Sequence, residues 1–155
     1  MFDFIAALIL VVAVDVGIPP NFALAIAYEE NSRLDPLIVS VPNGNGSRDY
    51  GVFQLNGDYI ASFVKDYWDK DWEFDWSNPY DNVYLACRHI KYLSNISRVT
   101  TWWAVALCYN AGYSRLVGPR GPPKSAVEYA GRVMEGWQRL EGRNYICPVI
   151  IGEKK

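Results

Sequence analysis

The chain has 155 residues, half of them apolar, and a formal net charge of −2. This length suits a single domain with a buried core, and the apolar content excludes intrinsic disorder. A slightly negative net charge argues against a basic surface that could neutralise a phosphate backbone, so nucleic acid is excluded as a partner. Cys87, Cys108, Cys147 and the only histidine, His89, lack the spacing of metal ligands. We therefore expect neither a metal nor a cofactor.

An apolar run, FIAALILVVAV, occupies residues 4–14. It predicts a buried first helix that ends near Gly17, because Ile18-Pro19-Pro20 breaks the pattern. The alternative is an export segment, but no basic residue precedes the run and no clear cleavage site follows it. The run is also too short to cross a bilayer, so we expect no integral membrane span.

A second helix is predicted from Pro20 to Glu30, since proline suits the first turn of a helix. It is apolar nearly all round, as a central buried helix is, and it ends in two carboxylates, Glu29 and Glu30. Burial and the C-terminal end of the helix dipole both raise the pKa of a carboxyl group. A raised pKa suits a general acid near neutral pH. The alternative is a solvated helix end with two surface acids.

The middle of the chain predicts less regular structure. Residues 37–56 indicate loops and short strands, including one extended piece over residues 50–55. Residues 60–76 mix tryptophans with acids, which favours an irregular loop pinned by its aromatic residues over a binding surface. A helix follows over residues 81–94, with apolar positions at helical spacing, and this spacing places Arg88 and His89 on the surface.

Two more helices are predicted in the C-terminal third. A buried helix over residues 101–109 is ended by Asn110-Ala111-Gly112. A loop over residues 118–123 leads to a last helix over residues 126–140, with Ser125 as its N-cap. In the tail, residues 142–155, an apolar patch over residues 146–151 could dock on the body.

Four short pieces stand out: the glutamate pair, Gly51-Val52-Phe53-Gln54, Tyr109-Asn110-Ala111-Gly112, and Tyr129. Each is ordinary alone. The segment Tyr109-Asn110-Ala111-Gly112 could be only a helix end, and Gln54 could be only a structural hydrogen bonder. In this order they resemble the lytic transglycosylase domain of the soluble-lytic-transglycosylase (SLT) type, within the lysozyme-like superfamily. The resemblance covers about residues 17–137. Further matching segments are Ala25–Glu30, Asp35-Pro36, Ser40, Asn78–Val83, Tyr92-Leu93 and Glu128–Ala130.

The resemblance implies a mainly α (α+β), lysozyme-like fold over a single domain, residues 1–155, with a small lobe of loops and short strands beside the active-site groove. It implies Glu30 as the catalytic acid. Between this glutamate and Asp35-Pro36 the chain has one residue more than the family pattern. If the pattern is instead counted back from Pro36 without an insertion, the catalytic position falls on Asn31, which cannot supply a proton. We prefer Glu30 to Glu29, because adjacent helix residues point about 100° apart and only one can face a groove. The implied substrate-binding residues are Ser40, Gly51, Gln54, Tyr109, Asn110 and Tyr129.

The implied partner is the glycan strand of peptidoglycan. A single glutamate would cleave the β-1,4 bond between N-acetylmuramic acid and N-acetylglucosamine and leave 1,6-anhydromuramic ends. Most glycosidases instead use two carboxylates, and Asp35, Asp49 or Glu29 could serve as the second in a muramidase or chitinase-like hydrolase. A third hypothesis is an inactive binding or assembly module on the same fold. The family implies a monomer in the periplasm or cell envelope, or secreted.

Overall fold

The computed structural model describes residues 2–142, with side chains from residue 4 onward. In this part of the chain, helices predominate and two short strands form the only sheet. The elements in order are α1 (Phe2–Val16), α2 (Pro20–Glu30), β1 (Asp49–Tyr50), β2 (Leu55–Asn56), α3 (Gly57–Tyr67), α4 (Pro79–Ser94), α5 (Trp102–Ala111), α6 (Tyr113–Val117) and α7 (Lys124–Leu140). The predicted mainly α fold with a small strand-containing lobe is confirmed.

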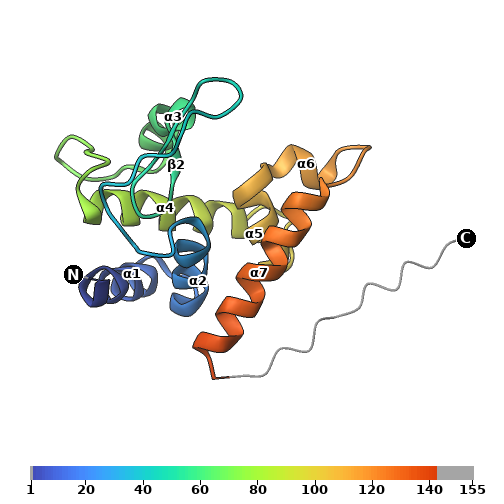
Figure 1. The fold of residues 1–155 in the computed structure, drawn as a ribbon, viewed down its shortest axis with the longest axis horizontal. Coiled ribbons are helices and arrows are strands. Elements are labelled where there is room, and N and C mark those ends of the chain that lie inside the picture. The colour runs from blue at the N-terminus through green and yellow to red at the C-terminus, as the bar shows by residue number, and fades with distance from the viewer. Residues whose placement is uncertain (1, 143–155) are drawn as a thin grey trace, which may run out of the picture.

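Helix α4 lies at the centre of the molecule (Figure 1). In this view α1 and α2 lie on one side of α4, and α3 and the strands lie on the other, while α7 runs along α2 and α5. One hydrophobic core joins these parts: Phe53 from the strand lobe is fully buried in the same cluster as Ile26 of α2, Leu85 of α4 and Leu107 of α5. The strand lobe is therefore fixed to the helical body by shared burial.

The segment between the strands is a tight turn. β1 pairs antiparallel with β2, with Tyr50 opposite Leu55, and residues 51–54 form the turn. The single extended piece predicted over residues 50–55 is therefore wrong. Gly51 has φ 73° and Gln54 has φ 46°, and such positive values reverse the chain within a few residues.

The irregular loop predicted over residues 60–76 is wrong in its first half. Residues 57–67 form α3, whose partly buried apolar positions Ile60, Phe63, Val64 and Tyr67 recur at helical spacing. Asn56 caps this helix by accepting a hydrogen bond from the Asp58 amide. The rest is irregular and held by aromatic residues as predicted; it includes edge-on contacts of Trp68 with Trp72 and Phe74.

The other predicted helices agree with the structure within a few residues. Ser125, however, does not cap α7, because the helix begins at Lys124 and no side chain caps its first turn. Cys87 and Cys108 are buried free thiols. Cys147 and the apolar tail patch lie outside the described residues. None of the described helices combines the length and apolarity that crossing a bilayer requires.

Candidate active site

A cleft of about 680 Å³ separates the strand lobe from the helical body. Its lining comes from the C-terminal end of α2, both strands, α3, the C-terminal half of α4, and the region joining α5 to α6. The volume is within the usual range for ligand sites, and the lining mixes aromatic rings with carboxylate and amide groups. Elements that are distant in the sequence thus meet around one hollow.

Glu30 lies in this cleft at the last residue of α2. Burial raises the pKa of its carboxyl group from 4.5 to about 7. A hydrogen bond from Tyr129 lowers the pKa, and the charges of Asp49 and Glu29 add smaller increases. The carboxyl group can therefore hold and release a proton near neutral pH, as a general acid must.

Tyr129 reaches Glu30 from α7, across the buried face between α7 and α2. Its hydroxyl donates a 2.6 Å hydrogen bond to Oε1 of Glu30. Burial, with the nearby Glu30 carboxylate, raises the pKa of Tyr129 well above its usual range, so the hydroxyl keeps its proton. Tyr129 thus orients one carboxyl oxygen of Glu30 and leaves the other oxygen free of any bond from the described residues.

Glu29 points to a different part of the molecule. It accepts a 2.6 Å hydrogen bond from Nε of Arg132 and lines a separate hollow between α2 and α7. Asn31, the residue selected by the alternative count, is buried and donates its side-chain amide to the carbonyl oxygen of Asp35. Of these three adjacent residues, Glu30 lines the cleft.

Gly51 shapes the turn beside the cleft. A Cβ atom at this position would lie 2.4 Å from Nδ2 of Asn82, and φ is 73°. Asn82 is fully buried on α4; it donates to the carbonyl oxygen of Tyr50 and accepts from the Phe53 amide. Gly51 thus packs closely against Asn82 and is not among the residues that line the cleft. Its contact with substrate stays a prediction. Asn82 was not predicted, although its spacing from Ala86 and Ile90 placed an amide on the buried face of a helix.

Gln54, Tyr109 and Asn110 all line the cleft. The side-chain amide of Gln54 donates to the carbonyl oxygen of Gly51, which leaves its own carbonyl oxygen available to a ligand. The buried hydroxyl of Tyr109 donates to the carbonyl oxygen of Phe53, so Tyr109 stabilises the turn between β1 and β2. Asn110 is exposed at the end of α5. These three residues and Glu30 therefore share one hollow.

Ser40 is not part of the cleft lining. Its hydroxyl accepts from the Asp49 amide and donates to the carbonyl oxygen of Val41. The backbone around it pairs with β1, since the Ser40 amide also donates to the carbonyl oxygen of Asp49. In this structure Ser40 holds the loop against the strand.

Asp49 is the second acid near Glu30 in the cleft. Nδ2 of Asn56 donates to it at 2.7 Å, and Nδ2 of Asn43 lies at 3.2 Å from its other oxygen. Asp49 forms no salt bridge within the described part of the chain. No cluster of His, Cys, Asp and Glu in the described chain could hold a metal ion.

The surface position predicted for His89 is wrong. Its ring stacks on Phe63 at 4.2 Å between centroids and lines the floor of the cleft. Burial lowers the pKa of the imidazole to about 4, so the ring is neutral near pH 7. Arg88 is half-buried and pairs with Asp69. The spacing of apolar residues in α4 could not show that α3 packs on the face of α4 that carries His89.

The family model of the transglycosylase SLT domain matches residues 8–125. The chain belongs to this family. The SLT match begins within α1 and ends near the start of α7, so its limits differ from the expected 17–137.

The 70 kDa soluble lytic transglycosylase SLT70 from Escherichia coli has a similar structure, with a TM-score of 0.63 and 19% sequence identity. The similarity covers 81% of this chain and 22% of SLT70, so the chain spans about a fifth of that protein. At this identity the likeness establishes the lysozyme-like fold alone. No curated protein matches the sequence.

Proposed function

We propose that this SLT domain is a lytic transglycosylase that cleaves the β-1,4 bond between N-acetylmuramic acid and N-acetylglucosamine in peptidoglycan. The observation that carries the proposal is the state of Glu30: its carboxyl group lines the cleft with a pKa raised to about 7. Such a group can give a proton to a leaving oxygen and take one back at the same pH. The proposed location is the periplasm or cell envelope, where this substrate occurs.

In the first proposed step, Glu30 protonates the glycosidic oxygen and the bond from this oxygen to C1 of the muramic residue breaks. The carbonyl oxygen of the substrate's own N-acetyl group bonds to C1 and takes up the positive charge. The free carbonyl oxygen of Gln54 lies in the same cleft and can accept the N–H of that acetamido group. Tyr129 holds Glu30 in place throughout.

In the second proposed step, the Glu30 carboxylate removes the proton from the C6 hydroxyl. The resulting oxygen attacks C1 and displaces the acetamido oxygen, which closes the 1,6-anhydro ring. The proton is now back on Glu30, and no water is consumed. One group thus serves as acid and then as base, so the route needs no second carboxylate.

Asp49 favours a second candidate, a hydrolase on the same fold. Its carboxylate lines the cleft with Glu30 and acts electrostatically on it. In this position Asp49 could deliver water to C1, as the base does in two-carboxylate glycosidases. Of the three acids considered from the sequence, Asp35 and Glu29 do not line the cleft.

Mass spectrometry of peptidoglycan digested by the chain separates these candidates. A transglycosylase leaves anhydromuramic ends, which are one water lighter than reducing ends. Reducing ends would support the hydrolase and overturn the proposal. Intact glycan strands would support an inactive binding module and would overturn both enzymatic candidates.

A further inference from the structure

Helix α1 presents a row of apolar side chains to solvent. Phe4, Val11 and Val14 are each 66–67% exposed, and Ala7 between them is exposed as well. Their spacing of three and four residues places all four on one side of the helix. The opposite side of α1 is buried in the core against α2 and α4. These four exposed residues form the α1 stripe.

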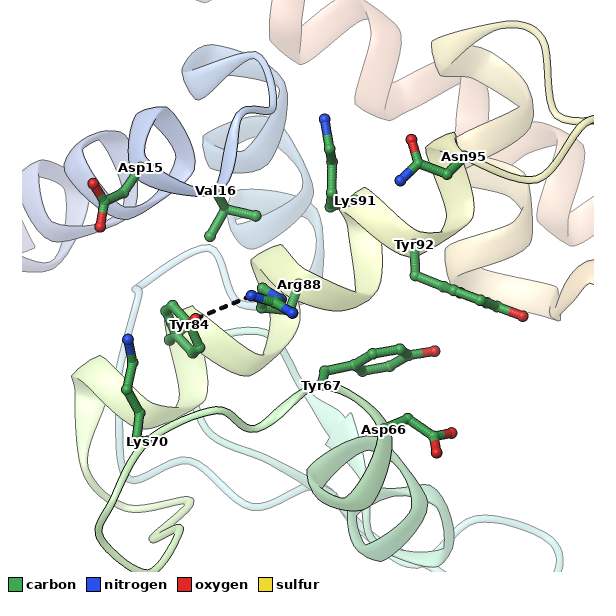
Figure 2. A pocket seen from close by; sticks show the side chains of 10 residues that line it. All are labelled: Asp15, Val16, Asp66, Tyr67, Lys70, Tyr84, Arg88, Lys91, Tyr92 and Asn95. Carbon is green, nitrogen blue, oxygen red and sulfur yellow. Dashed lines mark hydrogen bonds between the residues drawn. The ribbon is translucent and has the colours of Figure 1, made fainter.

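The α1 stripe is apolar along its whole length. Residues 4–14 contain no polar side chain, and the first charge that follows is Asp15. Figure 2 shows this polar end of α1, where Asp15 and Val16 line one hollow with Lys91 of α4. Single apolar residues are common on protein surfaces, whereas a contiguous apolar row indicates an interaction site. The partner of the stripe should therefore be apolar too.

The size and charge of the α1 stripe disfavour two possible partners. Its three large side chains expose roughly 300 Å² together, which is far below the 800 Å² or so per partner that a standard protein interface buries. A second copy of the chain would therefore gain little from pairing through this stripe. Helix α1 also has no Lys or Arg and has Asp3 and Asp15 near its ends, so anionic lipid head groups would repel it. A short apolar segment held nearby fits better than either.

The C-terminal tail contains a segment of this kind. Residues 146–151, with the sequence ICPVII, are all apolar and lie outside the described residues. Pro148 disfavours a helix there and favours an extended backbone at the residue before it. Six extended residues span about 20 Å, and the stretch from Phe4 to Val14 spans about 15 Å along a helix. The segment is therefore long enough to cover the α1 stripe.

The described chain ends near the C-terminal end of α1. Glu141, which follows α7, accepts a 3.3 Å hydrogen bond from Nδ2 of Asn21 in the first turn of α2. Asn21 comes only four residues after Gly17, at the end of α1. In Figure 1 the end of α7 lies below α2, and α1 lies beside α2. Residues 143–151 reach about 30 Å when extended, twice the length of the α1 stripe, which leaves half of that reach for the crossing from α7 to α1.

We propose that residues 146–151 of the tail bind along the α1 stripe and cover it. The tail would enter at Val14 and run toward Phe4, because α7 ends near the C-terminal end of α1. Tethering to α7 gives the segment a high effective concentration, so a modest apolar contact keeps the stripe covered. The inference goes beyond the proposed function and does not depend on it, since the α1 stripe takes no part in the cleft.

Cys147 lies within the tail segment and allows a cross-linking test on the full chain. With oxidised glutathione, a Val11→Cys variant should form an intramolecular disulfide with Cys147, which peptide mass spectrometry detects. Cys87 and Cys108 should not compete, because both are buried and burial raises the pKa of their thiols. The matched control is Val41→Cys, which replaces an 81% exposed valine on the loop before β1 and should link to Cys147 at least tenfold more slowly.

A tail variant separates docking from chance encounter. Ile150→Asp puts a charge into the apolar segment and leaves the described residues unchanged, so it should slow the disulfide of Val11→Cys at least tenfold through the lost burial of one aliphatic side chain. Glu153→Gln lies outside the segment and should leave the rate unchanged. Equal rates for Val11→Cys and Val41→Cys, or a rate that Ile150→Asp does not change, would overturn the proposal. Disulfides that join two copies would assign the α1 stripe to a second copy and would overturn it as well.

Discussion

The state of one carboxyl group, that of Glu30, determines the chemistry proposed for the cleft. Burial holds its pKa at about 7, so the proton needed for the first step is lost as pH rises through that value. Cleavage should therefore decline above pH 7. The hydrogen bond from Tyr129 lowers this pKa. Tyr129→Phe should raise it and move the alkaline limb of the kcat/KM profile to higher pH; a limb that stays in place or moves to lower pH would contradict the assignment.

The same burial has a cost in stability. A pKa raised from 4.5 to about 7 means that the folded state loses stability as pH rises from 4.5 to about 7, because the unfolded chain releases the proton of Glu30 at a lower pH than the folded protein does. At about 1.4 kcal/mol per pKa unit the cost approaches about 3 kcal/mol above pH 7 and vanishes below pH 4.5. Glu30→Gln should therefore increase the free energy of unfolding by up to that amount at pH 8.

Urea denaturation of wild type and Glu30→Gln at pH 8 and pH 4 measures this difference. The two proteins should differ at pH 8 and converge at pH 4, because the wild-type carboxyl group is then protonated in both the folded and unfolded states. A constant difference at both values would show that the substitution acts through packing and not through the buried charge.

At the scale of elements, the turn between β1 and β2 depends on Gly51. An alanine there would meet Asn82 at 2.4 Å and would adopt a strained φ of 73°. Gly51→Ala should destabilise the protein by about 3 kcal/mol, from backbone strain and from the displaced hydrogen bonds of Asn82. Gly44→Ala is the matched control, because nothing lies within 4 Å of its Cβ position and its φ is not positive. Similar unfolding free energies for the two variants would disprove this role.

The sequence predicted the elements whose pattern is local. Helices α2, α4 and α5 have clear apolar runs or spacing, and the residues at the ends of α2 and α5 were recognised from short motifs. Helix α3 was missed because its acids and aromatic residues hid the spacing of Ile60, Phe63 and Val64. His89 was misplaced because its burial depends on that helix, which packs on α4 from outside the local pattern.

The candidate site was partly predictable for the same reason. Glu30, Gln54 and Tyr109 belong to short motifs, and the structure brings all three to one cleft. The contacts of Ser40 and Gly51 could not be derived, since both depend on partners brought by folding: the Asp49 amide in one case and Asn82 in the other. Asp49 had been considered only as one of three acids, and its position in the cleft depends on the pairing of β1 with β2.

At the scale of the whole molecule, the strand lobe and the helical body share one core. Val52 and Phe53 are fully buried with residues of α2, α4 and α5. We therefore expect the chain to unfold in a single cooperative transition. Far-UV circular dichroism and tryptophan fluorescence should give coincident thermal curves. Three tryptophans follow α3, and the other three belong to α5 and α7. Two separated transitions would show that the lobe unfolds independently.

The central claim is that Glu30 alone supplies the proton, and one pair of variants tests it most directly. The measurement is kcat/KM on peptidoglycan for Glu29→Gln and Glu30→Gln, which change neighbouring carboxylates by the same chemistry. Glu30→Gln should lower kcat/KM by about 100- to 10,000-fold, as loss of a general acid does. Glu29→Gln removes the partly exposed pair with Arg132 and the smallest of the contributions to the raised pKa of Glu30, and it should stay within a few fold of wild type. An inactive Glu29→Gln beside an active Glu30→Gln would contradict the account.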